Sequence, residues 1–206
     1  EICACLVGSE MCIRDRDVTA PDGSETWSLC FDRNTIANVA DYIVFMAYDQ
    51  YGTNSNKAGT TAGYNWVEAN VKKFLGQEDV DPEKIILGIP LYMRLWEEEE
   101  DGTAKPEVVN MKDMFDVLPE NQVATWDEEL KQYYVEYEED GKTYKMWVEN
   151  EKSVGEKINL ANQYNLAGIA FWEKDRETND EFWTFVKEQL LSLIHISEPT
   201  RHAQIS

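Results

Sequence analysis

Positive charge is scarce in this sequence. Its 206 residues include 19 Lys and Arg against 40 Asp and Glu, for a formal net charge of −21. Binding to nucleic acid or to an anionic membrane surface needs clustered Lys and Arg, so both are excluded as principal partners. A neutral polysaccharide meets no such objection. The seven Trp and ten Tyr could serve as flat platforms for sugar rings, and they could equally fill a core.

Histidine and cysteine are also scarce, and most of them lie near the two ends of the chain. Residues 6–16 read LVGSEMCIRDR and residues 191–201 read LSLIHISEPTR. The two strands of one short DNA can encode both peptides, and chance does not account for eleven such matches. We therefore interpret residues 1–16 and 191–206 as adapter-like artefact tails from DNA sequencing. We expect them to make few contacts with the rest of the chain.

Between these tails the chain keeps one cysteine, Cys30, and no histidine. The others fall in the tails: Cys3, Cys5, Cys12, His195 and His202. A disulfide framework, a zinc site and a histidine-based triad are thereby excluded, and we expect neither a metal nor a cofactor. The apolar run at 190–196 is too short to span a bilayer. No signal peptide is visible, and we expect the true N-terminus to lie upstream.

Three continuous apolar segments predict buried parallel strands. They are residues 42–51 (YIVFMAYDQY), 85–92 (IILGIPLY) and 167–172 (AGIAFW). Residues 61–76 between the first two carry an apolar stripe at helical spacing, so the order is strand, helix, strand. The first segment ends in Tyr, Asp and Gln, and such strand ends carry the ligand sites of α/β folds.

Further secondary-structure elements are predicted before and after these segments. Residues 17–23 predict the tail of a strand running into a turn, and residues 32–40 a short helix capped by Asp32. A helix over 152–165 is expected to begin with a capping box between Ser153 and Glu156. A last helix is predicted from residue 180 to about 190.

The segment from residue 97 to about 150 breaks the alternation. Residues 132–137 and 143–148 alternate apolar and polar around an Asp-Gly pair, which predicts a β-hairpin. A short helix is expected at 111–118. The acidic run at 97–101 is interpreted as a solvated loop, with a calcium site as the less favoured alternative. This segment is therefore an α+β insert in a parallel fold.

Three motifs together resemble glycoside hydrolase family 18, the family of chitinases and of spore-cortex and cell-wall N-acetylglucosaminidases. Residues 46–49 (MAYD) resemble its sixth barrel strand, 88–96 (GIPLYMRLW) its seventh and 167–172 its eighth. An insert between the last two also fits. One departure is Met93, where many members have glycine. The resemblance implies an α/β fold, a partial (β/α)8 TIM barrel made of the last three to four β/α units, since a complete barrel needs ~250 residues.

The expected domains follow from this resemblance: partial barrel over 17–96, insert over 97–150 and the last barrel units over 151–190. The parent protein would be a monomer that acts on polysaccharide containing N-acetylglucosamine. It would be secreted, in association with a bacterial cell wall or spore.

The family hydrolyses β-1,4 links by substrate-assisted retention, in which the acetamido oxygen of the sugar attacks its own anomeric carbon. By resemblance, the catalytic residues are Tyr48, donating to the acetamide oxygen, and Asp49, bonding the sugar or that acetamide. Trp172 would form the floor under the reacting sugar. The remaining substrate-binding residues implied are Met46, Tyr92 and Arg94. Taken singly, each could instead be an ordinary strand end or core residue.

The proton donor of the family is a Glu at the end of the fourth strand, which would precede residue 17. The only similar segment is 79–83 (DVDPE), and it is rejected because it precedes a strand instead of ending one. Three alternatives stay open. The parent is a glycosidase, the parent is a non-catalytic sugar-binding protein of the same fold, or the 206 residues are an inactive fragment.

Overall fold

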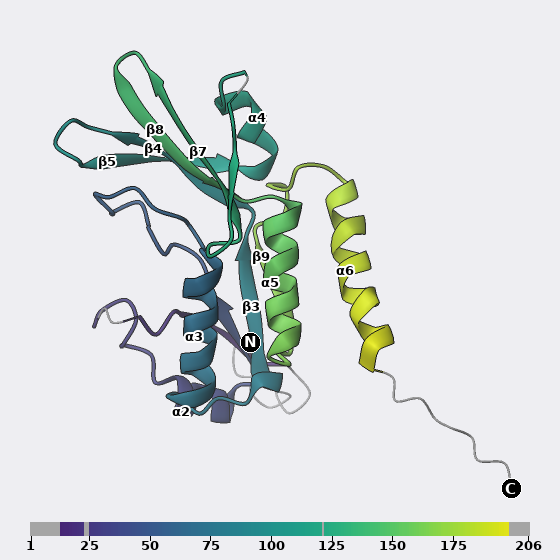
Figure 1. Cartoon of the computed structure of the whole chain (residues 1–206). Coiled ribbons are helices and arrows are strands. Elements are labelled where there is room, and N and C mark those ends of the chain that lie inside the picture. Colours follow the sequence, from purple (N-terminus) through teal and green to yellow (C-terminus); the bar gives the residue numbers. More distant parts are fainter. Residues whose placement is uncertain (1–12, 23–24, 121, 198–206) are drawn as a thin grey trace, which may run out of the picture.

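The computed structural model describes residues 13–22, 25–120 and 122–197, with side chains described as far as Leu191. Most of both expected tails lies outside these residues. Two β-sheets form the molecule, a parallel sheet of four strands and an antiparallel sheet of five. The second sheet extends beyond the carboxyl ends of the parallel strands (Figure 1).

The parallel sheet has the order β1-β2-β3-β9. Its strands are β1 (Asp15–Thr19), β2 (Tyr42–Met46), β3 (Ile85–Pro90) and β9 (Gly168–Trp172). The three predicted strands are thus confirmed as parallel neighbours, although β2 ends at Met46, earlier than its apolar pattern indicated. β1 begins at Asp15 and pairs with β2 from Tyr42 onward. Arg14, Asp15 and Arg16, which were assigned to the first tail, therefore contact the body through β2 and Asp41.

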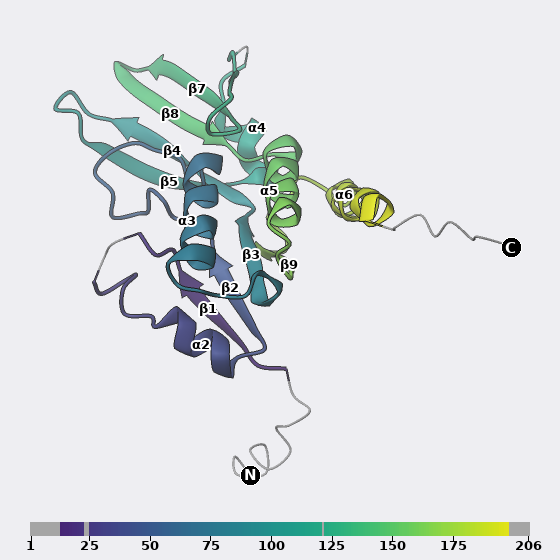
Figure 2. The same ribbon diagram turned by 60° about the horizontal axis from the view of Figure 1, so that its bottom comes forward.

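Helices cover one face of this sheet (Figure 2). They are α2 (Arg33–Val39), α3 (Tyr64–Gly76) and α5 (Glu151–Gln163). The last helix, α6 (Glu181–Ser197), lies on the outer side of α5 (Figure 2) and contacts the edge strand β9 through the Phe182 and Phe171 rings. Across the strands, Val18, Phe45 and Leu87 form one register row, and all three are fully buried in the core. The Phe45 and Phe74 rings lie 4.9 Å apart, which joins β2 to α3.

The opposite face is only partly covered. Its row contains Thr19, Met46, Gly88 and Ala170, which are register partners in the four strands. This face corresponds to the interior of a barrel, and the outer strands of the half barrel are β1 and β9. The expected partial barrel is therefore present, with β1 as the stub of an additional unit.

The second sheet has the order β5-β4-β8-β7-β6. Its strands are β4 (Tyr92–Glu98), β5 (Ala104–Asn110), β6 (Thr125–Asp127), β7 (Gln132–Glu139) and β8 (Lys142–Val148). The hairpin of β7 and β8 is confirmed, with positive φ at Asp140 and Gly141 as its two-residue turn requires. The short helix is confirmed as a 3₁₀ turn, η3 (Met111–Asp113), followed by α4 (Met114–Val117).

Two local expectations differ from the structure. The second sheet begins at Tyr92, so part of the segment expected in the barrel, and Glu97 and Glu98 of the acidic run, belong to β4. The α5 capping box is made by Asn150 and Ser153, not by Ser153 and Glu156. Asn150 fits because its side chain accepts from the Ser153 amide while Ser153 accepts from the Asn150 amide. The Asp32 cap on α2 is confirmed.

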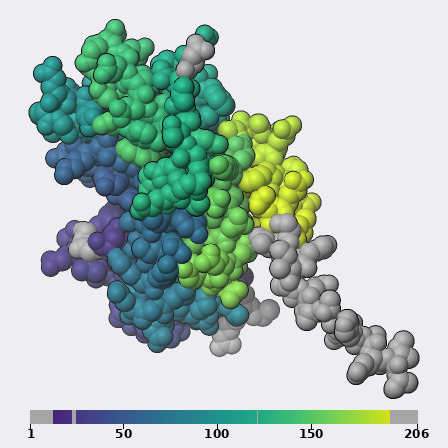
Figure 3. All heavy atoms as spheres, in the orientation of Figure 1, coloured from purple at the N-terminus to yellow at the C-terminus, as the bar shows by residue number. Residues whose placement is uncertain are grey.

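The insert packs directly on the helical layer. In the space-filling view it forms the upper part of the molecule, above α3 and α5 (Figure 3). One backbone contact joins them, because the Tyr64 amide at the start of α3 donates to the Leu130 carbonyl across 3.0 Å. No described helix is long and apolar enough to cross a membrane.

Candidate active site

A pocket of about 390 Å³ lies where the parallel strands end and the insert begins. Met46, Tyr48, Asp49, Tyr92 and Trp172 all line it, so the structure brings five of the six candidate residues together. Its other lining residues are Thr19, Ala20, Asp22, Trp27, Gln50 and Trp66. Three different parallel strands and the first strand of the insert therefore contribute to one site.

Asp49 is the central carboxylate of this pocket. It follows β2 in the left-handed region, with φ of 61°, a conformation that Asp adopts more readily than most residues with a side chain. Its Oδ1 accepts from the Tyr92 hydroxyl at 2.6 Å and from Arg94 Nη2 at 2.8 Å. Both donors come from β4, so the insert fixes the orientation of the carboxylate.

Arg94 does not line the pocket but lies behind it. Its side chain is 3% exposed, whereas that of Asp49 is 37% exposed. The guanidinium also lies 5.5 Å from the centre of the Tyr92 ring, in a cation–π contact. Arg94 therefore holds Asp49 from the buried side and leaves the other face of the carboxylate open.

Tyr48 projects into the pocket beside Tyr92, with the two ring centres 6.3 Å apart. Among the described residues, its hydroxyl makes no hydrogen bond. Burial, followed by the negative charges of Asp17 and Asp49, raises the pKa of Tyr48 to about 12. Burial and the Asp49 carboxylate also raise the pKa of Tyr92. Both hydroxyls are therefore neutral proton donors at pH 7, and that of Tyr48 is available to a ligand.

Gly88 makes room for the Tyr48 ring. A Cβ at this position would lie 3.2 Å from Tyr48 Cε1 and 2.8 Å from the Phe45 carbonyl oxygen. The second distance is shorter than real Cβ contacts, so only glycine fits here without a shift of the backbone. The glycine of the GIPLY motif is thus explained by close packing between β2 and β3.

Trp172 ends β9 with 51% of its surface exposed, although it is a large apolar side chain. It forms part of the pocket wall, and the peptide bond that follows it is cis. Met46 lies on the interior row of the sheet, next to Gly88 in the register. These two side chains supply apolar surface beside the polar cluster of Tyr48, Asp49 and Tyr92.

Sequence reasoning missed two aromatic residues of the pocket, Trp27 and Trp66. Trp27 follows the turn after β1, and its carbonyl accepts from the Thr19 hydroxyl at 2.6 Å. Trp66 lies in the first turn of α3, after the loop that leaves β2. The available sequence signal was that each Trp lies on the chain segment that leaves the carboxyl end of a parallel strand. Neither lies in a recognisable motif, so composition alone could not single them out.

The rejected segment 79–83 lies far from this edge in the topology. Asp81 caps the 3₁₀ turn η2 (Pro82–Lys84), which leads into the amino end of β3. The pocket lies at the carboxyl end of the same sheet. This placement agrees with the rejection of Glu83 as a proton donor.

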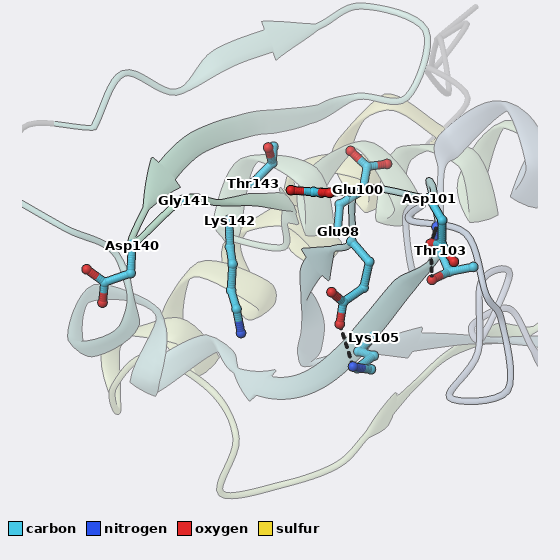
Figure 4. A pocket seen from close by; sticks show the side chains of 10 residues that line it. Glu98, Glu100, Asp101, Thr103, Lys105, Asp140, Gly141, Lys142 and Thr143 are labelled. Atoms are coloured by element: carbon cyan, nitrogen blue, oxygen red, sulfur yellow. Dashed lines mark hydrogen bonds and ion pairs between the residues drawn. The ribbon is translucent and has the colours of Figure 1, made fainter.

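The acidic run lines a second, wider pocket of about 750 Å³ at the tips of the β4–β5 and β7–β8 hairpins (Figure 4). Three carboxylates of the acidic run are paired with lysines: Glu97 with Lys142, Glu98 with Lys145 and Glu99 with Lys105. Asp101 accepts from the Thr103 backbone and hydroxyl within its own turn. Within the described parts of the chain, no group of three or more His, Cys, Asp or Glu is arranged to hold a metal ion.

Comparison with known proteins agrees with the fold and the motifs. The sequence matches the profile of Glycosyl hydrolases family 18 over residues 17–177. It is 26% identical over 180 residues to the uncharacterized glycosylase YvbX of Bacillus subtilis (strain 168), with 82% of this chain and 48% of that protein covered. The chain spans 35% to 52% of the length of the curated relatives it matches.

Solved structures of chitinases and related enzymes also superpose on this chain. A chitinase from Chromobacterium violaceum superposes with a TM-score of 0.75 at 26% identity, covering 85% of this chain and 55% of that one. The spore cortex-lytic enzyme SleL of Bacillus cereus superposes with a TM-score of 0.70 over 84% of this chain and 41% of its own, at 18% identity, and shows likeness of fold alone.

The fold and the pocket together define a partial (β/α)8 barrel with an α+β insert, whose aromatic pocket with a central carboxylate lies at the carboxyl ends of its strands. The chain belongs to the glycosyl hydrolases of family 18. Met93, the departure from the family motif, is fully buried in β4, and its register partner is Val109. It is not among the residues that line the candidate site, although its chain neighbours Tyr92 and Arg94 both contact Asp49.

Proposed function

We propose that this chain is the C-terminal part of a glycosidase that cleaves β-1,4 links in polysaccharide containing N-acetylglucosamine. One observation carries the proposal. Tyr48, Asp49, Tyr92 and Trp172 converge on a single pocket at the carboxyl ends of the parallel strands. A phenol with a free hydroxyl can donate to an acetamide oxygen, a fixed carboxylate can accept from the sugar, and an exposed indole can pack against its ring.

The proposed mechanism uses the substrate's own acetamide. Its oxygen attacks the anomeric carbon as the bond to the leaving oxygen breaks, which gives a cyclic oxazolinium intermediate that water then opens with net retention. Tyr48 would donate to the acetamide oxygen, and Asp49 would bond the acetamide or the sugar and stabilise the positive charge that develops. Trp172 would pack under the reacting ring, beside Met46. Tyr92 and Arg94 would act by orienting Asp49.

The leaving oxygen must also receive a proton, and the described pocket offers no second carboxylic acid in a matching position. Its only other carboxylate is Asp22, an exposed residue in the turn after β1. We propose that the parent's proton donor is the fourth-strand Glu of the family, outside this chain. The isolated chain would then bind oligosaccharide without hydrolysing it, and a parent without that Glu would be a sugar-binding protein.

We further propose that the parent acts outside the cell, on a bacterial wall or spore, as a monomer. Support comes from the names of its relatives, which include a Bacillus subtilis glycosylase and a Bacillus cereus spore cortex-lytic enzyme. Chitin and peptidoglycan share the acetamido sugar that this pocket would recognise. The proposal therefore names that sugar and not the whole polymer.

Binding and turnover can be measured separately. Isothermal titration of the chain with N-acetylglucosamine trimer should detect weak binding, and Trp172→Ala should weaken it roughly two- to tenfold, because an aromatic contact is worth ~0.5–1.5 kcal/mol. Phe115→Ala is a matched control, since Phe115 is also exposed but lines a different pocket. No binding by the wild-type chain would contradict the proposal.

For turnover, the chain alone should release no product from chitooligosaccharides or peptidoglycan, because a positioned acid contributes ~10²–10⁴-fold. Joining it to the parent's upstream half should restore hydrolysis. Hydrolysis by the 206 residues alone, abolished by Glu83→Gln, would overturn the assignment of the missing proton donor.

A further inference from the structure

Gln132, the first residue of β7, bridges the insert to the loop that leaves the candidate site. It is fully buried. Its Nε2 donates to Glu149 Oε1 at 2.5 Å, and its Oε1 accepts from the Thr60 hydroxyl at 2.5 Å. One side chain thus connects the end of β8 with the segment between β2 and α3.

Charged groups behind Gln132 fix the direction of this bridge. The Glu149 carboxylate is fully buried and accepts from Lys157 Nζ at 2.8 Å and from the Ser153 hydroxyl at 2.7 Å. Lys157 is 1% exposed, so the ion pair is closed to solvent. A carboxylate can only accept, so Gln132 must present its NH₂ group to Glu149 and its carbonyl to Thr60. The amide is therefore held in one orientation.

Residues 60–61, which Gln132 contacts through Thr60, form backbone hydrogen bonds with the two residues that follow Asp49. The Thr60 carbonyl accepts from the Tyr51 amide at 3.2 Å, and the Thr61 carbonyl accepts from the Gln50 amide at 3.0 Å. The Thr61 hydroxyl also accepts from Arg94 Nη1, at a long 3.4 Å. Asp49 is thus held from one side by β4 and from the other by this segment.

We propose that Gln132 is a positioning residue of the candidate site. Through Thr60 it fixes residues 60–61, and through them the backbone of Gln50 and Tyr51, which holds Asp49 in its left-handed conformation. The Glu149–Lys157 pair supplies the fixed anchor. The link to sugar binding rests on the proposed function, whereas the link to the Asp49 loop stands on the hydrogen bonds alone.

Amide hydrogen exchange on the free chain tests the loop directly. Gln132→Met keeps the length of the side chain and removes both hydrogen bonds, so protection at the Gln50 and Tyr51 amides should fall roughly tenfold. Val135→Ala is the matched control, because Val135 is buried in the same strand within the core and makes no contact with Thr60 through a hydrogen bond. It should lower the melting temperature without selective loss at those two amides.

A second pair of variants guards against misfolding of Gln132→Met. Thr60→Val removes the hydroxyl, which also accepts from the Ala62 amide at 3.2 Å, so it should lower protection at least as much, whereas Thr60→Ser keeps both hydrogen bonds and should leave protection at the wild-type level. The affinity for N-acetylglucosamine trimer should fall several-fold in Gln132→Met and Thr60→Val, and not in Val135→Ala.

The outcomes are distinguishable. Unchanged protection at Gln50 and Tyr51 in both Gln132→Met and Thr60→Val overturns the positioning role. So does an affinity that merely follows the melting temperature in all variants, Val135→Ala included. Failure of the wild-type chain to bind the trimer overturns the proposed function, and the exchange data then decide the role of Gln132 alone.

Discussion

The Tyr92 hydroxyl donates to Oδ1 of Asp49 across 2.6 Å, and this contact joins the first residue of the insert to the end of a barrel strand. Asp49 receives Arg94 at the same oxygen. One carboxylate oxygen is thus occupied by the protein, and Oδ2 stays available for a ligand.

Two substitutions of Asp49 should separate the contribution of its charge to stability from that of its backbone conformation. Asp49→Asn should lower the free energy of unfolding by about 1 kcal/mol, a value that allows for solvent screening at Asp49, which is 37% exposed although its partner Arg94 is buried. Asp49→Ala should cost ~1–2 kcal/mol more, because alanine does not easily adopt a positive φ. Chemical denaturation measures both values, and equal losses in the two variants would contradict the conformational part.

Tyr48 should make stability fall at alkaline pH. Its pKa in the folded chain is about 12, above the ordinary tyrosine value of about 10. Above pH 10 the unfolded chain therefore loses a proton that the folded chain retains, so stability decreases between pH 10 and 12. Urea midpoints measured across this range should fall less steeply in Tyr48→Phe. Tyr92 contributes in the same direction, so the slope in Tyr48→Phe should not vanish entirely.

Gly88→Ala should disturb the site from within the sheet. The new Cβ would meet the Phe45 carbonyl at 2.8 Å, so we expect a loss of ~1–3 kcal/mol and a displaced Tyr48 ring. Gly168→Ala is the matched control, since it lies in the neighbouring strand β9 and its Cβ would meet nothing within 4 Å. Thermal unfolding and trimer affinity should distinguish them. Equal effects would contradict the packing argument.

Breaking the buried ion pair should be costly. Glu149→Gln leaves Lys157 charged and without its counter-ion, which should lower stability by ~3–5 kcal/mol. The double variant Glu149→Gln with Lys157→Met removes the charge as well and should recover much of that loss. A double variant as unstable as Glu149→Gln, measured by denaturation, would show that the cost does not come from the unpaired charge.

Much of the fold could be predicted because its strands are continuous apolar runs and its hairpin has a two-residue Asp-Gly turn. The strand at 42–46, for example, is buried on the helical side and half-buried on the other, as a barrel strand requires. The boundary at Tyr92 could not be predicted. β3 and β4 are separated by Leu91 alone, so the apolar run does not reveal where one sheet ends.

The candidate site was predictable where a motif carried it. Motifs at strand ends contain Tyr48, Asp49, Tyr92 and Trp172. In contrast, Trp27 and Trp66 line the pocket because of the way a loop and a helix pack against the sheet. The position of such a loop depends on tertiary contacts, for example the hydrogen bond from the Thr19 hydroxyl to the Trp27 carbonyl. The roles of all these residues in sugar chemistry stay predictions.

Leu91 restricts movement of the insert relative to the parallel sheet. It is fully buried between β3 and β4, its amide donates to the Trp172 carbonyl, and its own carbonyl accepts from the Met111 amide. A hinge needs residues that can change their backbone angles freely, and this junction has both polar groups engaged. These two hydrogen bonds restrain rotation of the insert about Leu91, so the pocket walls formed by the two sheets are held in place relative to one another.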